Sequence, residues 1–152
     1  MTYACQIVHQ LPRPVLAVRT RTPVDNLPVV LDAAYNAIEE HLAALGEEPA
    51  GPPFVGYFNM DMADLDLQIG FPVARPLPGG GDVQPDILPE CHLATCLHTG
   101  PYPQMAAAYQ ALTEFLEQAH RTPSGVVYET YLNNPVDTPA EQLCTRIDFI
   151  LK

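Results

Sequence analysis

Positively charged side chains are scarce in this 152-residue chain, which has seven Lys and Arg against 18 Asp and Glu and a formal net charge of −11. Nucleic-acid binding depends on Lys and Arg that neutralise phosphates, so this composition argues against direct binding of DNA. A negative protein surface instead attracts cations over about one Debye length, roughly 8–10 Å at physiological ionic strength. We therefore expect cationic partners.

Long apolar runs are also missing. A membrane-spanning helix needs about 20 consecutive apolar residues, and no run in this chain approaches that length. Residues 1–6 lack the basic segment that begins a secretion signal. We expect a cytoplasmic protein without membrane association. Its hydrophobic content of 47% suits one globular domain with a sizeable core.

The cysteines show neither a paired CxxC spacing nor the density of a disulfide-held secreted domain. They are Cys5, Cys91, Cys96 and Cys144. We interpret them as buried, reduced side chains. One metal site can be drawn, because His92, Cys96 and His98 would share a face of a strand. Three such residues spread over about 20 Å unless the strand bends, so we predict no metal and no cofactor.

In the first half of the chain, hydrophobic patterning predicts the order strand, helix, strand, strand. The strands are expected at residues 11–20, 54–58 and 65–71. Asp25 and Asn26 supply a helix cap, Pro28 suits the first turn, and Gly46 ends the helix.

The second half predicts the same order, with strands at residues 91–98, 126–135 and 143–150 and a helix that begins at residues 99–103. Pro135 is expected to end the middle strand of the three. Between the halves, residues 72–89 are rich in Pro and Gly and predict a connection without regular structure.

The two halves align as a repeat. A shift of 74 residues superposes the apolar stripes of the two helices, which are Leu31, Tyr35, Ile38, Leu42 and Met105, Tyr109, Leu112, Leu116. The same shift places Tyr57 on Tyr131, and it also superposes the asparagines two residues later (131 − 57 = 74). The Leu-Pro pairs at residues 11–12 and 88–89 match at a shift of 77, which requires a loop three residues longer in the first copy.

Glu129 is a lone acid among apolar and aromatic residues of its strand. It could point into solvent, as on any two-faced strand. The alternative is that Glu129 and Tyr131, two residues apart and so on one face, look into a ligand cavity. The repeat places Val55 opposite Glu129 in the alignment, so the acid is an addition to one copy, and this favours the second interpretation.

Five short motifs in order resemble the GyrI-like small-molecule-binding domains, which include the effector-binding halves of bacterial multidrug-responsive transcription activators. They lie at residues 64–73, 88–90, 98–102, 129–135 and 145–147, so the resemblance covers nearly the whole chain. It implies an α+β fold of tandem duplicated strand-helix-strand-strand units that share an antiparallel sheet with two main helices. We expect a single domain over residues 1–152, with repeats at about 11–74 and 88–151 and a connection at about 75–87.

The resemblance also implies a function. In drug-binding members a buried glutamate amid aromatic rings receives the charge of a lipophilic cation, and Glu129 matches its motif position. The ligand-binding residues that we predict are Glu129, Tyr131, Tyr57, Tyr102 and Phe71. Tyr102 has the alternative role of packing the second helix only. For Tyr35 and Tyr109, inside the helix stripes, we predict core packing.

Three roles follow for a domain that we expect to stand alone, since no helix-turn-helix precedes its first strand. The first is a protein that binds lipophilic, cationic, aromatic compounds. The second is a hydrolase of strained electrophilic natural products in which Glu129 activates water; the chain has no Trp for the large aromatic wall that such hydrolases tend to carry. The third is a protein partner, like the topoisomerase inhibitor that gives the family its name. An acidic strip that mimics DNA would support this role, but the acids are scattered along the sequence.

Overall fold

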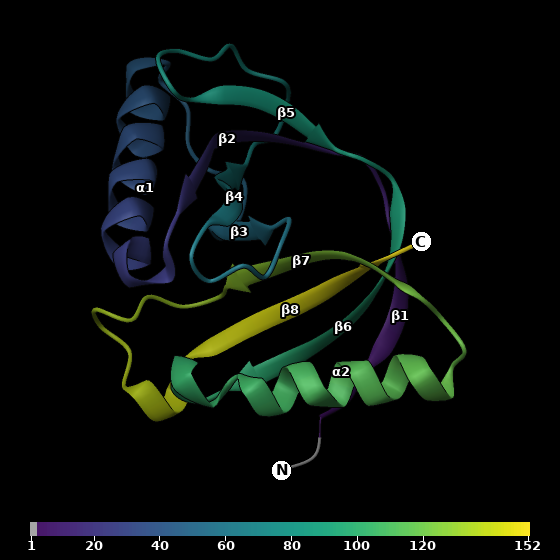
Figure 1. The fold of residues 1–152 in the computed structure, drawn as a ribbon. Coiled ribbons are helices and arrows are strands. Elements are labelled where there is room, and N and C mark those ends of the chain that lie inside the picture. The colour runs from purple at the N-terminus through teal and green to yellow at the C-terminus, as the bar shows by residue number, and fades with distance from the viewer. Residues whose placement is uncertain (1–2) are drawn as a thin grey trace. The chain divides into compact units, whose positions relative to one another are not determined.

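Residues 3–152 are described by a computed structural model, and they divide into two compact units. The first unit contains residues 11–89, and the second contains residues 90–152 together with the segment before residue 11. Each unit has one main helix and four antiparallel strands (Figure 1). The α+β class, the two main helices and the antiparallel strand pairing are thus confirmed.

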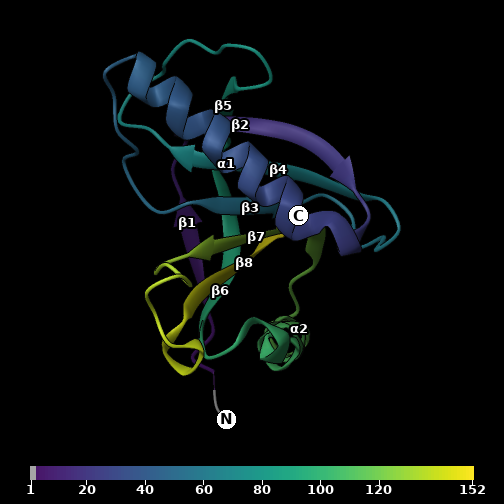
Figure 2. The same cartoon turned by 90° about the vertical axis from the view of Figure 1, so that its left-hand side faces the viewer.

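In the first unit the strands neighbour one another in the order β3-β4-β2-β5. Along the chain the elements are β2 (Arg13–Thr22), the short 3-10 helix η1 (Val24–Asn26), α1 (Leu27–Ala44), β3 (Phe54–Tyr57), β4 (Leu65–Pro72) and β5 (Gln84–Leu88). Helix α1 packs on β2 and β4, as the side view shows (Figure 2). Its apolar stripe closes a core whose buried residues are Leu16, Ile38, Leu42, Phe71, Val73, Leu77 and Val83.

In the second unit the strand order is β1-β6-β8-β7. The elements are β1 (Gln6–Gln10), β6 (Cys91–Thr99), η2 (Tyr102–Gln104), α2 (Ala106–Gln118), β7 (Pro123–Tyr131), η3 (Ala140–Gln142) and β8 (Cys144–Leu151). Helix α2 packs on β6 and β8. The buried core residues are Ala94, Cys96, Met105, Ala108, Leu112, Leu116, Val127, Ile147, Phe149 and Leu151.

The start of α1 agrees with the sequence in position but not in mechanism. Asn26 is the N-cap residue and Pro28 lies in the first turn, as predicted, yet the Asn26 side chain makes no capping hydrogen bond. One turn of 3-10 helix leads directly into α1 instead. At the other end Gly46 adopts a φ of 70°, the left-handed conformation that glycine tolerates best, and the helix stops there.

Two strands were not predicted. The expectation that residues 72–89 form only a connection was wrong, because β5 lies within them and pairs with β2, from Arg13↔Leu88 to Ala17↔Gln84. The other strand is β1, which pairs with β6. Both are five residues long, and each gains its backbone hydrogen bonds from a neighbour distant in sequence. Local patterning carries little information about such pairing.

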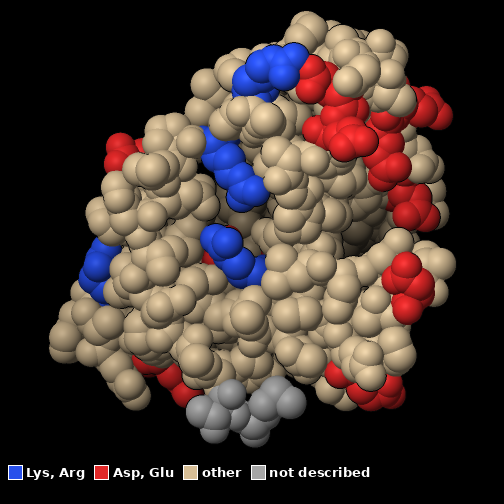
Figure 3. Space-filling model, turned by 180° about the vertical axis from the view of Figure 1, so that it is seen from behind, with Lys and Arg blue, Asp and Glu red and all other residues tan. Residues whose placement is uncertain are grey.

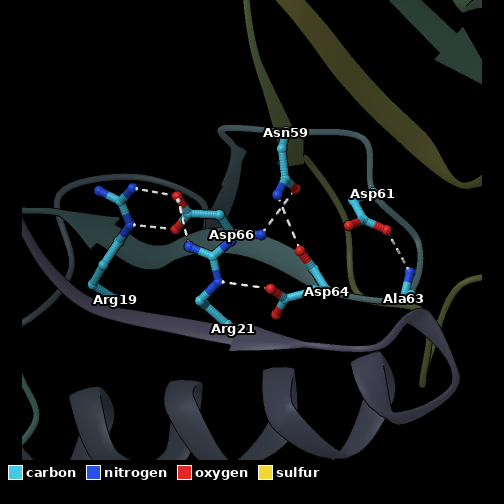
Figure 4. Close-up of polar contacts among 7 residues, drawn as sticks. All are labelled: Arg19, Arg21, Asn59, Asp61, Ala63, Asp64 and Asp66. Carbon is cyan, nitrogen blue, oxygen red and sulfur yellow. Dashed lines mark hydrogen bonds and ion pairs between the residues drawn. The ribbon is translucent and has the colours of Figure 1, made fainter.

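Each unit closes its β3–β4 or β7–β8 connection with one asparagine. Asn59 Nδ2 donates to Asp64 O at 3.0 Å, and Asn59 Oδ1 accepts from the Asp66 N–H at 3.0 Å (Figure 4). Asn133 makes the same two bonds with Gln142 O and Cys144 N, both at 2.9 Å. The repeated asparagine is therefore a structural clamp. It also explains why β7 ends at Tyr131 and not at Pro135 as predicted: beyond Tyr131 the side chain of Asn133 takes over the cross-strand bonding.

Strand registers correct one detail of the repeat alignment. Val15 pairs with Pro72, and Leu93 pairs with Ile150. Both partners differ by 78 residues (93 − 15 = 78; 150 − 72 = 78), not by the 77 that the Leu-Pro pairs indicated. The difference matters because side chains alternate with a period of two, and a slip of one residue would exchange the faces of the strand. The duplication itself stays a prediction.

No helix within residues 3–152 is long and apolar enough to cross a membrane.

Candidate functional site

Glu129 lies near the end of β7 and projects from the face that packs against α2. Val127, two residues earlier, is in the core of the second unit at 6% exposure, and the alternation of the strand carries Glu129 and Tyr131 onto that same face. Glu129 itself is half-buried. It is paired across the ladder with Ile147, which is fully buried.

Two tyrosine hydroxyls hold the carboxylate, one on each oxygen. Tyr131 Oη donates to Glu129 Oε1 at 2.8 Å. Tyr109 Oη, from the middle of α2, donates to Glu129 Oε2. Hydrogen bonds from neutral donors to an ionised acceptor are stronger than neutral pairs and fix its orientation. The interpretation of Glu129 as a solvated strand residue does not fit these contacts.

Aromatic rings surround the carboxylate. The Tyr102 ring stands nearly edge-on to the Tyr131 ring, with centroids 5.8 Å apart and planes at 64°. On the helix side, Tyr109 packs against Phe149 with centroids 5.5 Å apart and an angle of 58°. Tyr102 is 36% exposed and belongs to η2, so it is the ring of this group most open to solvent.

The electrostatics of Glu129 differ from those of the other structured acids. Burial raises the pKa of Glu129, and the hydrogen bonds from Tyr109 and Tyr131 offset part of that effect. The negative charge of Glu129, after burial, helps to raise the pKa of Tyr102. No Lys or Arg among residues 3–152 forms an ion pair with Glu129. Its charge is thus held by neutral donors alone.

Asp66 and Asp148 show the usual alternative. Asp66 accepts two bonds of 2.9 Å from Arg19 (Figure 4), and this guanidinium lowers the pKa of the Asp66 carboxyl. Asp148 is 4% exposed and accepts a 2.9 Å bond from Arg146. An acid that is withdrawn from water normally has such a cation beside it. Glu129 is the half-buried acid that lacks one within the described chain.

The turn before α2 is held from beneath by a buried histidine. His98 is 1% exposed; one ring nitrogen is 3.0 Å from Tyr3 Oη and the other is 3.2 Å from Pro101 O. Gly100, between them in sequence, has a φ of 137°, where a side chain would be strained. These contacts fix the segment that carries Tyr102.

The structure brings three of the five predicted ligand-binding residues together, namely Glu129, Tyr131 and Tyr102. The other two belong to the first unit. Tyr57 ends β3 at 9% exposure, and Phe71 is 8% exposed in the core of that unit, where it contacts the Tyr35 ring. A ligand-binding role for these two residues stays a prediction.

Sequence reasoning missed Tyr109. Its place in the α2 stripe predicted core packing, and its ring does pack, but its hydroxyl bonds to Glu129. A stripe shows which side of a helix faces the sheet and not which strand residue a hydroxyl meets. The metal arrangement that could be drawn on β6 is not assembled either: His98 contacts Tyr3 and Pro101, whereas His92 is exposed and stacks on His9 with centroids 4.9 Å apart.

Charge on the surface is unevenly spread. In the face of Figure 3 the Asp and Glu side chains gather mainly along one side, and the Lys and Arg side chains are few and separated by uncharged surface. With a net charge of −11, the long-range field of the chain favours cations.

Comparison with known proteins gives a family and a fold. The family model described as the GyrI-like small molecule binding domain matches residues 3–150. No curated protein matches this chain. The crystal structure of the EcmrR C-terminal domain is similar over 100% of this chain and 99% of that one, with a TM-score of 0.84 and 17% identity.

Longer and more distant structures extend the comparison. The EcmrR chain in its complex with DNA matches with a TM-score of 0.85 and 18% identity over 99% of this chain, which spans only 57% of that EcmrR chain. A hydrolase from Listeria innocua matches with 0.70 and 15% over 97% of this chain and 91% of its own. SAV2435 bound to tetraphenylphosphonium matches with 0.67 and 13% over 100% and 94%. At these identities the likeness shows the fold alone.

Proposed function

We propose, from the premise that this chain belongs to the GyrI-like small-molecule-binding domain family, that it binds lipophilic, cationic, aromatic compounds at Glu129. The observation that carries the proposal is the state of the Glu129 carboxylate. It is half-buried, it is held on both oxygens by tyrosine hydroxyls, and no cation of the described chain neutralises it.

A ligand cation would supply the missing countercharge. Burial makes the ionised form of Glu129 unfavourable in the free protein, and a positive charge in contact with the carboxylate relieves that cost. The Tyr102 and Tyr131 rings offer faces and edges to a flat or multi-ring ligand, each worth on the order of 0.5–2 kcal/mol by stacking and cation–π attraction. Selection by charge and aromatic character would admit many ligands.

A structural neighbour supports this ligand class. SAV2435, whose fold is similar to that of this chain, was solved with tetraphenylphosphonium, a lipophilic cation with four phenyl rings. The same compound is therefore a suitable probe. Tetraphenylborate has the same shape and the opposite charge, so the pair separates recognition of charge from recognition of shape.

The test is calorimetric titration of both compounds into the wild type, Glu129→Gln and Glu117→Gln. Glutamine keeps the shape of Glu129 and loses its charge, so we expect tetraphenylphosphonium affinity to fall by about 1.5–3 kcal/mol, the scale of a bond to a charged group. Glu117 is an exposed acid of α2, and its variant matches the change in net charge. Tetraphenylborate should bind neither variant better than weakly. Equal cation affinity in all three proteins would refute the proposal.

A hydrolase is the second candidate, favoured by the raised pKa of Glu129 and by the structural likeness to the hydrolase from Listeria innocua. A carboxylate of raised pKa is a better general base for water. In that case Glu129→Gln should abolish turnover of epoxide, ester or cyclopropane substrates and leave the binding of neutral ligands largely intact. Binding without turnover across such a panel would leave the binding protein alone.

A further inference from the structure

The Thr145 side chain of β8 is fully buried and unsatisfied. Its residue is 0% exposed, and within residues 3–152 its Oγ1 has no hydrogen-bond partner. Almost all buried polar groups in proteins have a partner, because leaving one unpaired is costly. The unpaired hydroxyl therefore requires an explanation.

Strand registers place Thr145 beside the candidate site. On one side it pairs with Tyr131 of β7, and on the other with His98 of β6. The Tyr131 hydroxyl already donates to Glu129, and the two ring nitrogens of His98 already contact Tyr3 and Pro101. The neighbours in this row are thus engaged elsewhere, and Thr145 lies diagonally across the ladder from Glu129, which pairs with Ile147.

The first unit shows what the scaffold alone needs at this position. Thr145 corresponds to Leu67 at the shift of 78 residues that relates β4 to β8, and Leu67 is also 0% exposed. Leucine fills such a place with no polar atom to satisfy. The hydroxyl is consequently not a requirement of the fold, and like Glu129 opposite Val55 it is a polar group added to one unit only.

We propose that Thr145 Oγ1 is the second polar contact of the ligand and accepts an N–H of a protonated or amino-substituted aromatic cation whose charge meets Glu129. The inference rests on the proposed function and narrows it to cations that carry N–H groups. Diagonal neighbours on a sheet face are about 7–8 Å apart at the backbone, a span that an amino group between the two side chains bridges. Because Thr145 is fully buried, entry requires the Tyr102 and Tyr131 rings to shift apart, and Tyr102 is the exposed member of that pair.

The experiment uses two dyes with one xanthene core and one positive charge. Rhodamine 123 carries amino N–H groups, and tetramethylrhodamine methyl ester has methyl groups in their place. Affinities are measured by fluorescence anisotropy for the wild type, Thr145→Val, Thr145→Ser and Glu129→Gln. We expect Thr145→Val to weaken rhodamine 123 about tenfold, equivalent to about 1.4 kcal/mol, and to leave the methylated dye unchanged. Thr145→Ser, which keeps the hydroxyl, should retain the wild-type preference.

The variants separate this inference from the proposed function. If Glu129→Gln weakens neither dye, or the wild type binds neither, the proposed function fails and this inference fails with it. If Glu129→Gln weakens both dyes but Thr145→Val affects them equally or not at all, only the inference is overturned. Thermal unfolding of the free proteins adds a second measurement. Valine removes an unsatisfied hydroxyl and should melt no lower than the wild type; a clearly lower midpoint that serine restores would show that the hydroxyl has a structural partner, and would also overturn the inference.

Discussion

The two units make the same aromatic contact and use its hydroxyl differently. In the first unit Tyr35 packs against Phe71 with centroids 5.4 Å apart and an angle of 66°, and in the second Tyr109 packs against Phe149 at 5.5 Å and 58°. Tyr35 Oη donates to the backbone carbonyl of Phe54 at 3.0 Å. Tyr109 Oη donates to the side chain of Glu129.

This difference separates scaffold from site. The helix stripe, the Tyr–Phe pair and the asparagine clamp occur in both units, so they serve packing and chain reversal. Val55 and Leu67, both 0% exposed, are apolar where the second unit has Glu129 and Thr145. Polar groups that the fold does not need are concentrated in one unit, and that is where we look for the ligand.

Exchanging the acid between units gives the largest expected effect. Val55→Glu would bury a carboxylate where the nearby Tyr35 hydroxyl is already bonded to Phe54. An uncompensated buried charge costs about 3–5 kcal/mol, so urea unfolding at neutral pH should show a loss of that size. The loss should shrink in acid, where the new carboxyl is protonated.

The reverse change, Glu129→Val, is the matched control, and it should cost far less because Glu129 is itself disfavoured as an ion. A Val55→Glu protein within about 1 kcal/mol of the wild type would show that the first unit accommodates an acid as readily as the second. The distinction between scaffold and site would then be lost.

The fold was largely predictable from the sequence because its periodic stripes decide which residues are buried. The α1 and α2 stripes and the alternation of β4 and β8 each survive as one side of a core. β1 and β5 were not predictable, since they are short strands whose pairing depends on partners about 70 residues away or more. Their sequences contain no alternation strong enough to outweigh the flanking Pro and Gly.

The candidate site was predictable only along one strand. A period of two places Glu129 and Tyr131 on one face, and they are in contact in the structure. Tyr109 and Thr145 reach the same place from a helix and another strand, so their roles follow from tertiary packing and registers. Single-sequence patterns do not encode which of two buried hydroxyls is left without a partner.

Removing the two equivalent hydroxyls sharpens the comparison at the next level of effect. Tyr109→Phe loses a bond to a charged acceptor, which is worth about 1.5–3 kcal/mol, whereas Tyr35→Phe loses a bond to a neutral carbonyl, worth about 0.5–1.5 kcal/mol. Both variants keep the ring that packs on phenylalanine. Urea unfolding at neutral pH measures both losses, and equal losses would mean that Glu129 is not ionised there.

The asparagine clamps should behave alike in the two units. Asn59→Ala and Asn133→Ala each remove two bonds to backbone atoms in a half-buried turn, and we expect each to cost about 1 kcal/mol in free energy of unfolding. Neither should change the affinity for tetraphenylphosphonium beyond that loss of folded protein. A specific loss of binding in Asn133→Ala alone would assign this residue to the site and remove it from the shared scaffold.

The smallest expected effect is the pH dependence that Glu129 adds to the second unit. Its pKa is raised in the folded protein by burial, so between the unfolded value of about 4.3 and the higher folded value the native state binds more protons than the unfolded state. Stability should therefore fall as pH rises through this window, and remain constant for this group above it. The Tyr109 and Tyr131 hydrogen bonds lower the pKa and keep the slope small. Binding of tetraphenylphosphonium should follow the opposite course, because only the ionised carboxylate supplies countercharge: affinity should rise with pH through the pKa of the free protein and level off above it. Glu129→Gln should remove both dependences, as seen by urea unfolding and calorimetry at a series of pH values, and Val55, with nothing to titrate, predicts that no slope remains from the corresponding position of the first unit. A Gln variant that keeps the wild-type slopes would place the titrating group elsewhere and leave Glu129 without the electrostatic role that distinguishes its unit.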